Sequence, residues 1–234
     1  MATVYAGNSG RVYRYVSETW SSIRNNSTGS SASDSLGSNT QAVRVFHTSG
    51  RGGDTFQINR SFFYFDTSGI TGTLSDATLK IYGLTNGTAD IIAVKSDAFG
   101  GDGGTALSTA DYNNLDFSTA YSAELATWST SGYNDITLNA TALTDMKNND
   151  AFIVCVIEHD HDYADSAPSG AAYNVGMFYH DYSGTSRDPY IDYTVSTGPV
   201  MGKVNSVTDG NIDKVNNQRN AVELGKINGI TDTD

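Results

Sequence analysis

Nine short segments with strand character follow one another between residues 11 and 195, and this series constrains the fold more than any other feature. Each segment mixes apolar–polar alternation with short apolar runs, and each is bounded by clusters of Gly, Asn, Asp or Ser. Many short strands separated by turn residues are typical of a β-sandwich. The segments are residues 11–16, 42–47, 58–66, 77–84, 90–96, 135–139, 151–158, 172–180 and 189–195.

The stretches between these segments add little helix. Residues 108–115 open with a serine that can cap a short helix. Residues 139–149 place Asn139 at an N-cap and Lys147 near the C-terminus, which predicts a second short helix. The Gly/Ser-rich run 24–40 is predicted to be a long polar loop or a disordered insert.

The composition changes near residues 196–200, after which aromatic residues vanish. One phrase then occurs three times, with Lys203-Val204-Asn205 returning at 214–216 and 226–228. Its apolar series is too regular for a solvated linker and has no core of its own. The tail therefore packs on its own sandwich or docks on another chain. The residues predicted to bind a partner are Val204, Val207, Ile212, Val215, Leu224, Ile227 and Ile230.

Residues 59–84 carry a resemblance: an arginine, an aromatic strand ending in Phe-Asp, then "ATL" and an apolar strand. This segment, with residues 136–160 and 187–195, resembles DNRLRE-type and related carbohydrate-binding-like jelly-roll modules. The resemblance implies a two-sheet antiparallel jelly-roll β-sandwich, here over residues 1–197, and does not by itself imply an activity. The tail, residues 198–234, resembles imperfect repeats at the ends of structural proteins from tailed bacteriophages.

The charge and the apolar pattern exclude several classes of protein. A formal net charge of -12 argues against a nucleic-acid partner, because a polyanion would be repelled. No stretch reaches the roughly 18 apolar residues that a membrane-spanning helix needs, and no secretory signal is predicted. No nucleophile elbow, phosphate loop or Cys/His nucleophile pattern is present, so we predict no enzyme.

Two stretches are weak candidates for metal sites. In "EHDHDYAD", His159 and His161 would share one face of an extended chain, but a third ligand at matching spacing is absent. The alternative is a solvated strand exit whose acidic residues protect an edge. Asp97 and Asp102, among the glycines of residues 96–116, suggest a structural calcium. Their spacing is not that of an EF-hand, and a loop without metal is the favoured interpretation.

Aromatic residues are the candidates for stacking on sugar rings. Most of them are expected in the core or in cross-strand pairs. Trp128, in a polar stretch, is expected to be exposed and is the candidate glycan-binding residue.

Together these features predict a non-enzymatic virion structural protein, a capsid decoration or fibre component attached to other virion proteins through its C-terminal repeats. It would be made in the host cytoplasm, released by lysis, and form a homo-oligomer, with a trimer expected by analogy with phage appendages. The alternatives are a glycan-binding module for a cell-surface polysaccharide and a self-assembling extracellular filament subunit.

Overall fold

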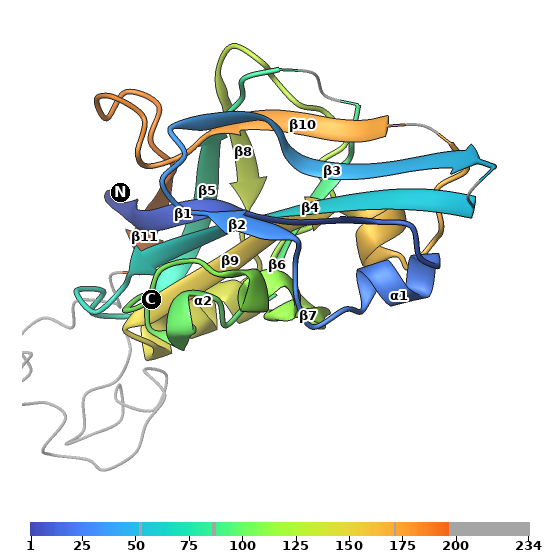
Figure 1. Cartoon of the computed structure of the whole chain (residues 1–234). Coiled ribbons are helices and arrows are strands. Elements are labelled where there is room, and N and C mark those ends of the chain that lie inside the picture. The colour runs from blue at the N-terminus through green and yellow to red at the C-terminus, as the bar shows by residue number, and fades with distance from the viewer. Residues whose placement is uncertain (52, 86–87, 171, 197–234) are drawn as a thin grey trace, which may run out of the picture. The chain divides into compact units, whose positions relative to one another are not determined.

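The computed structural model describes residues 1–51, 53–85, 88–170 and 172–196. The predicted boundary after residue 197 and all seven predicted tail contacts lie outside the described residues. The described part is a two-sheet β-sandwich in which every strand pair is antiparallel (Figure 1). The predicted fold class is therefore confirmed.

The strands are β1 (Ala2–Val16), β2 (Ser31–Ser33), β3 (Ser38–Gly50), β4 (Gly53–Asp66), β5 (Leu74–Tyr82), β6 (Ile91–Ser96), β7 (Leu115–Ala120), β8 (Tyr133–Thr137), β9 (Ala151–Glu158), β10 (Ala172–Phe178) and β11 (Tyr190–Val195). The helices are α1 (Trp20–Arg24) and α2 (Ala140–Asn148), with 3-10 turns η1 (Phe99–Gly101) and η2 (Thr109–Asn113) and a π-turn η3 (His159–Tyr163). Asn139 caps α2 as predicted, since its side chain accepts a hydrogen bond from the Ala142 amide.

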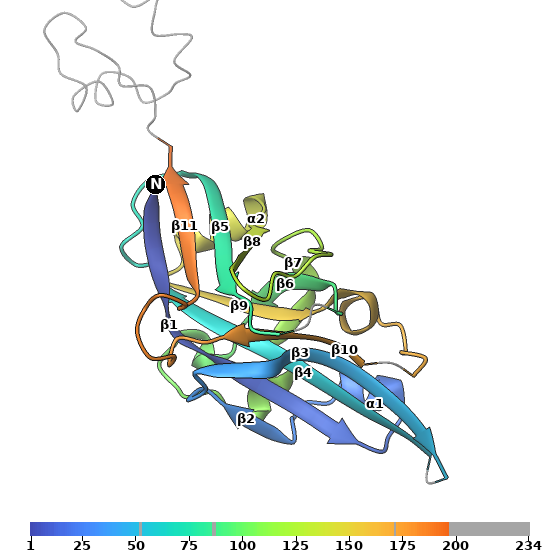
Figure 2. The ribbon, with the colours of Figure 1, turned by 90° about the horizontal axis from the view of Figure 1, so that it is seen from above.

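Strand β1 belongs to both sheets. Residues Ala2–Tyr5 pair with β11, which continues through β5 to β8 in the smaller sheet. Beyond a register shift at Ala6/Asn8, β1 pairs with β4, which continues through β9 and β6 to β7 in the larger sheet. Over its first half, β4 still pairs with β1 on one side, but its partner on the other side is β3 rather than β9. Strand β3 in turn pairs with β10. Figure 2 shows β1, β4 and β3 running side by side away from β5, β8 and β11.

Strand β9 of the larger sheet is buried on both faces. In β9, Phe152, Val154 and Val156 face the core between the two sheets, and the alternate residues Ile153 and Cys155 face a second core. The second core lies between the larger sheet and the segments α1, η1 and η2. This double burial explains the continuous apolar sequence of β9.

The run 24–40 is not the loop or disordered insert that its composition predicts. It contains β2 and the start of β3, and β2 pairs with β1, with Arg11 opposite Ser33. Gly10 permits this approach, since a Cβ there would lie 2.2 Å from the Ser33 carbonyl oxygen. The Gly29 amide also donates to the Thr109 carbonyl at 2.8 Å. Backbone pairing to distant segments, which composition does not reveal, orders the run.

A buried arginine holds the second core together. Arg60 of β4 is fully buried and binds both carboxylate oxygens of Asp162 at 2.8 Å. It also donates to the carbonyls of Tyr112 (2.7 Å) and Arg24 (2.9 Å). Arg24 in turn donates to the Asp162 carbonyl at 2.6 Å. Burial opposes the charge of Arg60, but the Asp162 carboxylate outweighs this and raises the pKa of Arg60. We call these residues the Arg60 node.

The node gives the first prediction. Asp162→Asn keeps the shape of the side chain but removes the charge opposite Arg60. The free energy of unfolding, measured by urea denaturation, should fall by about 3–5 kcal/mol, because a buried guanidinium is left uncompensated. The double replacement Arg60→Met/Asp162→Leu should cost much less, since it removes both charges.

The control for this prediction is Arg14→Gln, which breaks the more exposed 2.9 Å pair with Glu18 and should change stability little. An Asp162→Asn variant as stable as Arg14→Gln would show that the node does not hold the second core.

Candidate functional site

The two histidines of "EHDHDYAD" do not share a face, so this expectation is wrong. Glu158 ends β9, and its carboxylate accepts hydrogen bonds from the amides of Asp160, His161 and Asp162. These bonds curl the chain into η3, where the alternation of an extended strand is lost. The His161 ring donates to Glu158 at 2.9 Å and packs on Tyr173. His159 therefore has a different set of neighbours.

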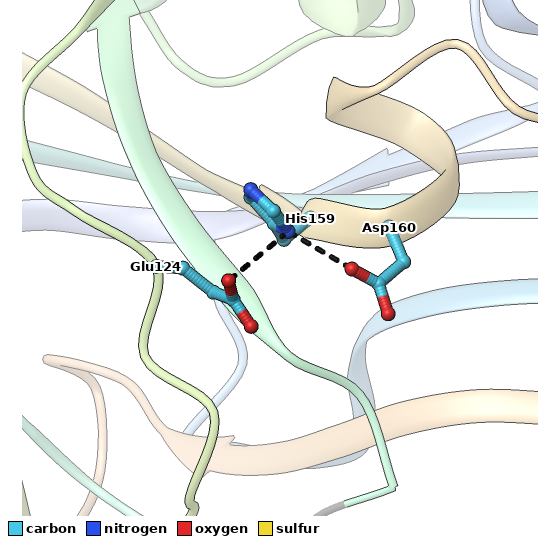
Figure 3. A group of neighbouring side chains, drawn as sticks. All are labelled: Glu124, His159 and Asp160. Atoms are coloured by element: carbon cyan, nitrogen blue, oxygen red, sulfur yellow. Dashed lines mark hydrogen bonds and ion pairs between the residues drawn. The ribbon is translucent and has the colours of Figure 1, made fainter.

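His159 forms the one group of three candidate metal ligands within the described ranges. Its Nδ1 lies 2.9 Å from Asp160 Oδ1 and 3.7 Å from Glu124 Oε2 (Figure 3). Glu124 and Asp160 are exposed and His159 is half-buried. The imidazole already bonds Asp160, so the cluster is a surface contact between η3 and the loop before β8. A divalent ion would have to displace that bond, and the geometry gives it only three ligands.

The predicted calcium residues, Asp97 and Asp102, line one open hollow of about 440 Å³ with Asp145 and Asp150. Both are exposed, and Asp102 accepts a hydrogen bond from the Gly104 amide at 2.8 Å. Among the described residues, no three carboxylates here bring their oxygens within 4.8 Å of one another. The hollow is acidic, but it is not a coordination cage like those that calcium prefers.

Lys95 and Tyr121 occupy the inner side of this hollow and bind one of its carboxylates. Asp145 Oδ2 accepts hydrogen bonds from Tyr121 at 2.6 Å and from Lys95 at 2.9 Å. Burial opposes the ionisation of Asp145, but these bonds outweigh it and lower the pKa of the carboxyl. The hollow therefore contains an internal ion pair that ties α2 to β6.

Trp128 is half-buried rather than exposed, which corrects the expectation for the glycan candidate. Its indole packs against the core between the sheets, and its Nε1 donates to the Gly176 carbonyl at 3.0 Å. Gly83 makes room for it, since a Cβ there would lie 2.8 Å from that nitrogen. Trp128 thus fastens the loop before β8 to β10, and its ring is not a free platform.

An aromatic row covers the outer face of the smaller sheet instead. Its rings follow one another with centroids 4.6–5.6 Å apart. The order of the row is Tyr5, Tyr190, Tyr133, Tyr82, Phe178 and Tyr182. Alternation in β1, β5, β8 and β11 places the tyrosines on one face. Arg187 lies over the last three rings, and its guanidinium carbon is 4.6 Å from the centroid of the Phe178 ring.

Most of this row is fixed by the protein itself. Tyr133 donates its hydroxyl to the carbonyls of Ser186 (3.1 Å) and Asp188 (3.2 Å). Burial raises the pKa of Tyr133 to about 12. Tyr5, at the open end, is 52% exposed. One end of the row is therefore free to stack on a planar or ring-shaped ligand, and the rest holds that end in position.

The sequence predicts part of this row but not the row as a whole. The outward positions Tyr82, Tyr133 and Tyr190 can be read from alternation within each strand, whereas their adjacency depends on the strand order. That order was not available from the sequence.

Comparison with known proteins gives no relative: no protein-family model matches the chain, and no curated protein matches it. No helix in the part that the structure describes is long and apolar enough to cross a membrane. Function must therefore be argued from the geometry and from the repeats.

The Asp145 pair gives a prediction on pH. A carboxyl whose folded pKa lies below its unfolded value of about 3.9 stabilises the protein at neutral pH. That contribution is lost as the pH falls below about 5 toward the folded pKa. Asp145→Asn should therefore lower the free energy of unfolding at pH 7, and its difference from wild type should shrink at pH 3 in urea denaturation.

The matched control is Asp150→Asn, which removes an exposed carboxylate of the same hollow. A deficit of Asp145→Asn that stays equal at both pH values would contradict a role for its ionised form.

Proposed function

We propose that the protein is a non-enzymatic structural component of a phage particle, displayed as a β-sandwich and attached to other virion proteins by its C-terminal repeats. The observation that carries this proposal is the phrase Lys-(Val/Ile)-Asn, which occurs three times after residue 200. A capsid decoration or a fibre component fits a domain of this kind.

The packing of the sandwich supports the proposal that the sandwich is displayed and the repeats attach it. Among the residues that the structure describes, the buried members of both cores lie between Ala6 and Ile191. Such a domain buries its own apolar side chains, whereas the repeats bring apolar residues without enough chain to bury them. The repeats are therefore the part that gains most from a partner, and repeated contacts favour multivalent attachment, for which we propose a homotrimer.

A glycan-binding module is the second candidate function. The observation that favours it is the aromatic row, because rigid rings on an open sheet face supply contact area at a low cost in conformational entropy. Tyr5 is its exposed member, and it takes the place of Trp128 as the candidate residue. A displayed domain and a glycan-binding module are compatible in one protein.

The anchoring proposal gives a prediction on the repeats. Val204, Val215 and Ile227 occupy the same place in the three phrases. Burying each should contribute about 1.5–2 kcal/mol before ordering costs are subtracted. Replacing all three by Asp should abolish co-sedimentation with the particle, because charges would have to be buried.

The matching control is deletion of residues 199–234. This should give a folded, soluble and unattached domain that keeps its melting temperature. A truncated chain that unfolds would show that the tail belongs to the core of the domain. End-to-end polymers of purified protein in the electron microscope would instead favour a filament subunit.

The second candidate predicts saturable binding of the full chain to a neutral polysaccharide on a glycan array. Tyr5→Ala should weaken that binding about tenfold, since one aromatic contact is worth roughly 1 kcal/mol or slightly more. Tyr163→Ala is the control, because Tyr163 lies in η3 and belongs neither to the aromatic row nor to the strands of the smaller sheet. Equal losses in both variants would exclude the aromatic row as the binding surface.

A further inference from the structure

A second open surface lies where β1, β4 and β3 run beyond the smaller sheet (Figure 2). In the paired strands, Tyr13 lies opposite Asn59, and Asn59 lies opposite Arg44. One step further out, Tyr15 lies opposite Gln57, and Gln57 lies opposite Phe46. Because directly paired residues share a face, these side chains form two adjacent rows. We call this surface, with Arg11 and Gln41, the arginine face.

The arginine face contains a shallow hollow of about 310 Å³. Its lining consists of Arg11, Tyr13, Tyr15, Gln41 and Gln57, and includes no carboxylate. The acidic hollow beside α2 has four aspartates in its lining. Two hollows of the same domain thus have opposite electrostatic character.

The two arginines of this face have no counter-charge. Within the described ranges neither Arg11 nor Arg44 forms an ion pair, although the chain carries a formal net charge of -12. The Nε atoms of both are buried and unpaired. Burial lowers the pKa of Arg44 from its ordinary value. Holding an uncompensated guanidinium half-buried in an acidic protein is costly, and an incoming anion would relieve that cost.

A network of amides holds the face in shape. Gln57 donates to Asn59 at 2.9 Å, and Asn59 donates to the Gln41 carbonyl at 2.6 Å. Arg11 donates to the same carbonyl at 3.3 Å and lies over the Tyr13 ring, 4.9 Å from its centroid. Arg44 lies over Phe46 at 4.7 Å. The guanidinium groups are thus positioned by stacking and hydrogen bonds before any ligand arrives.

We propose that the arginine face binds a saccharide bearing carboxylate groups, such as a uronate residue of an acidic polysaccharide. The guanidinium groups supply planar, two-pronged donors that match a carboxylate. Tyr15, 52% exposed, offers a ring for stacking, and the amides offer donors and acceptors for hydroxyl groups. The mixture of aromatic, amide and cationic groups fits an acidic sugar better than it fits an acidic peptide.

This inference extends the glycan-binding candidate to a second surface and a different class of sugar, and it does not depend on particle attachment. The proposals for the two surfaces can be tested, and refuted, independently of each other. Loss of neutral-glycan binding in Tyr5→Ala reports on the aromatic row, whereas binding of a uronate polymer reports on the arginine face.

The test measures binding of the full chain to polygalacturonate, alginate and hyaluronate, with dextran and polyglutamate as probes of other chemistry. We expect saturable binding to at least one uronate polymer, held by the local arginine contacts against the overall repulsion between a chain of net charge -12 and a polyanion. The double variant Arg11→Gln/Arg44→Gln should lose about tenfold or more in affinity. Tyr15→Ala should also weaken binding, and its exposed position leaves the fold intact should the arginine variant fold poorly.

The control Arg51→Gln/Lys147→Gln removes the same number of charges from exposed positions elsewhere and should keep its affinity within about twofold. Three results would overturn the proposal. They are an equal loss in the control, no binding to any uronate polymer, and binding to polyglutamate as tight as to the uronates, which would indicate an acidic peptide.

Discussion

The fully buried charge of Arg60 is the constraint on which the larger sheet depends. A guanidinium cannot enter a core without a counter-charge and partners for its donors. The chain supplies them from segments far apart in sequence: the carboxylate of Asp162, and the carbonyls of Arg24 and Tyr112. Satisfying one side chain therefore draws α1, η2 and η3 onto the same face of the sheet. The second core forms between these segments and the sheet, and without them the face of β4 and β9 would be exposed.

The same constraint explains the cluster of acidic residues and histidines in "EHDHDYAD", residues 158–165. Glu158 uses its carboxylate to cap η3, and that turn presents Asp162 to Arg60. The acidic residues after β9 are thus divided between capping, ion pairing and a surface cluster around His159. In an extended strand this stretch would resemble a metal site. In the folded chain it forms η3, and its acidic side chains bind the protein's own groups instead. The cap and the buried ion pair are made by Glu158 and Asp162, and the two histidines do not take part in either.

How far the sequence predicts the structure depends on whether a feature is local. The all-β class and the cap at Asn139 follow from period and turn chemistry, and they are confirmed. Residues 24–40 are ordered because β2 pairs with β1. Trp128 is half-buried because its indole N–H donates a hydrogen bond to the Gly176 carbonyl. Both are long-range contacts that composition does not encode. The arginine face and the aromatic row were missed for the same reason, because adjacency across strands requires the strand order.

The fold also limits where a ligand can bind. The larger sheet is covered on one face by the smaller sheet and on the other by the segments around the Arg60 node. Two open sheet surfaces remain in the described part of the chain: the outer face of the smaller sheet, with its tyrosines, and the extension of β1, β4 and β3, whose arginines form no ion pair with the described residues. Half-buried guanidinium groups without a carboxylate partner cost stability that a purely structural surface could avoid. A carboxylate ligand at the arginine face would offset that cost, and this is the physical basis for proposing recognition at that surface.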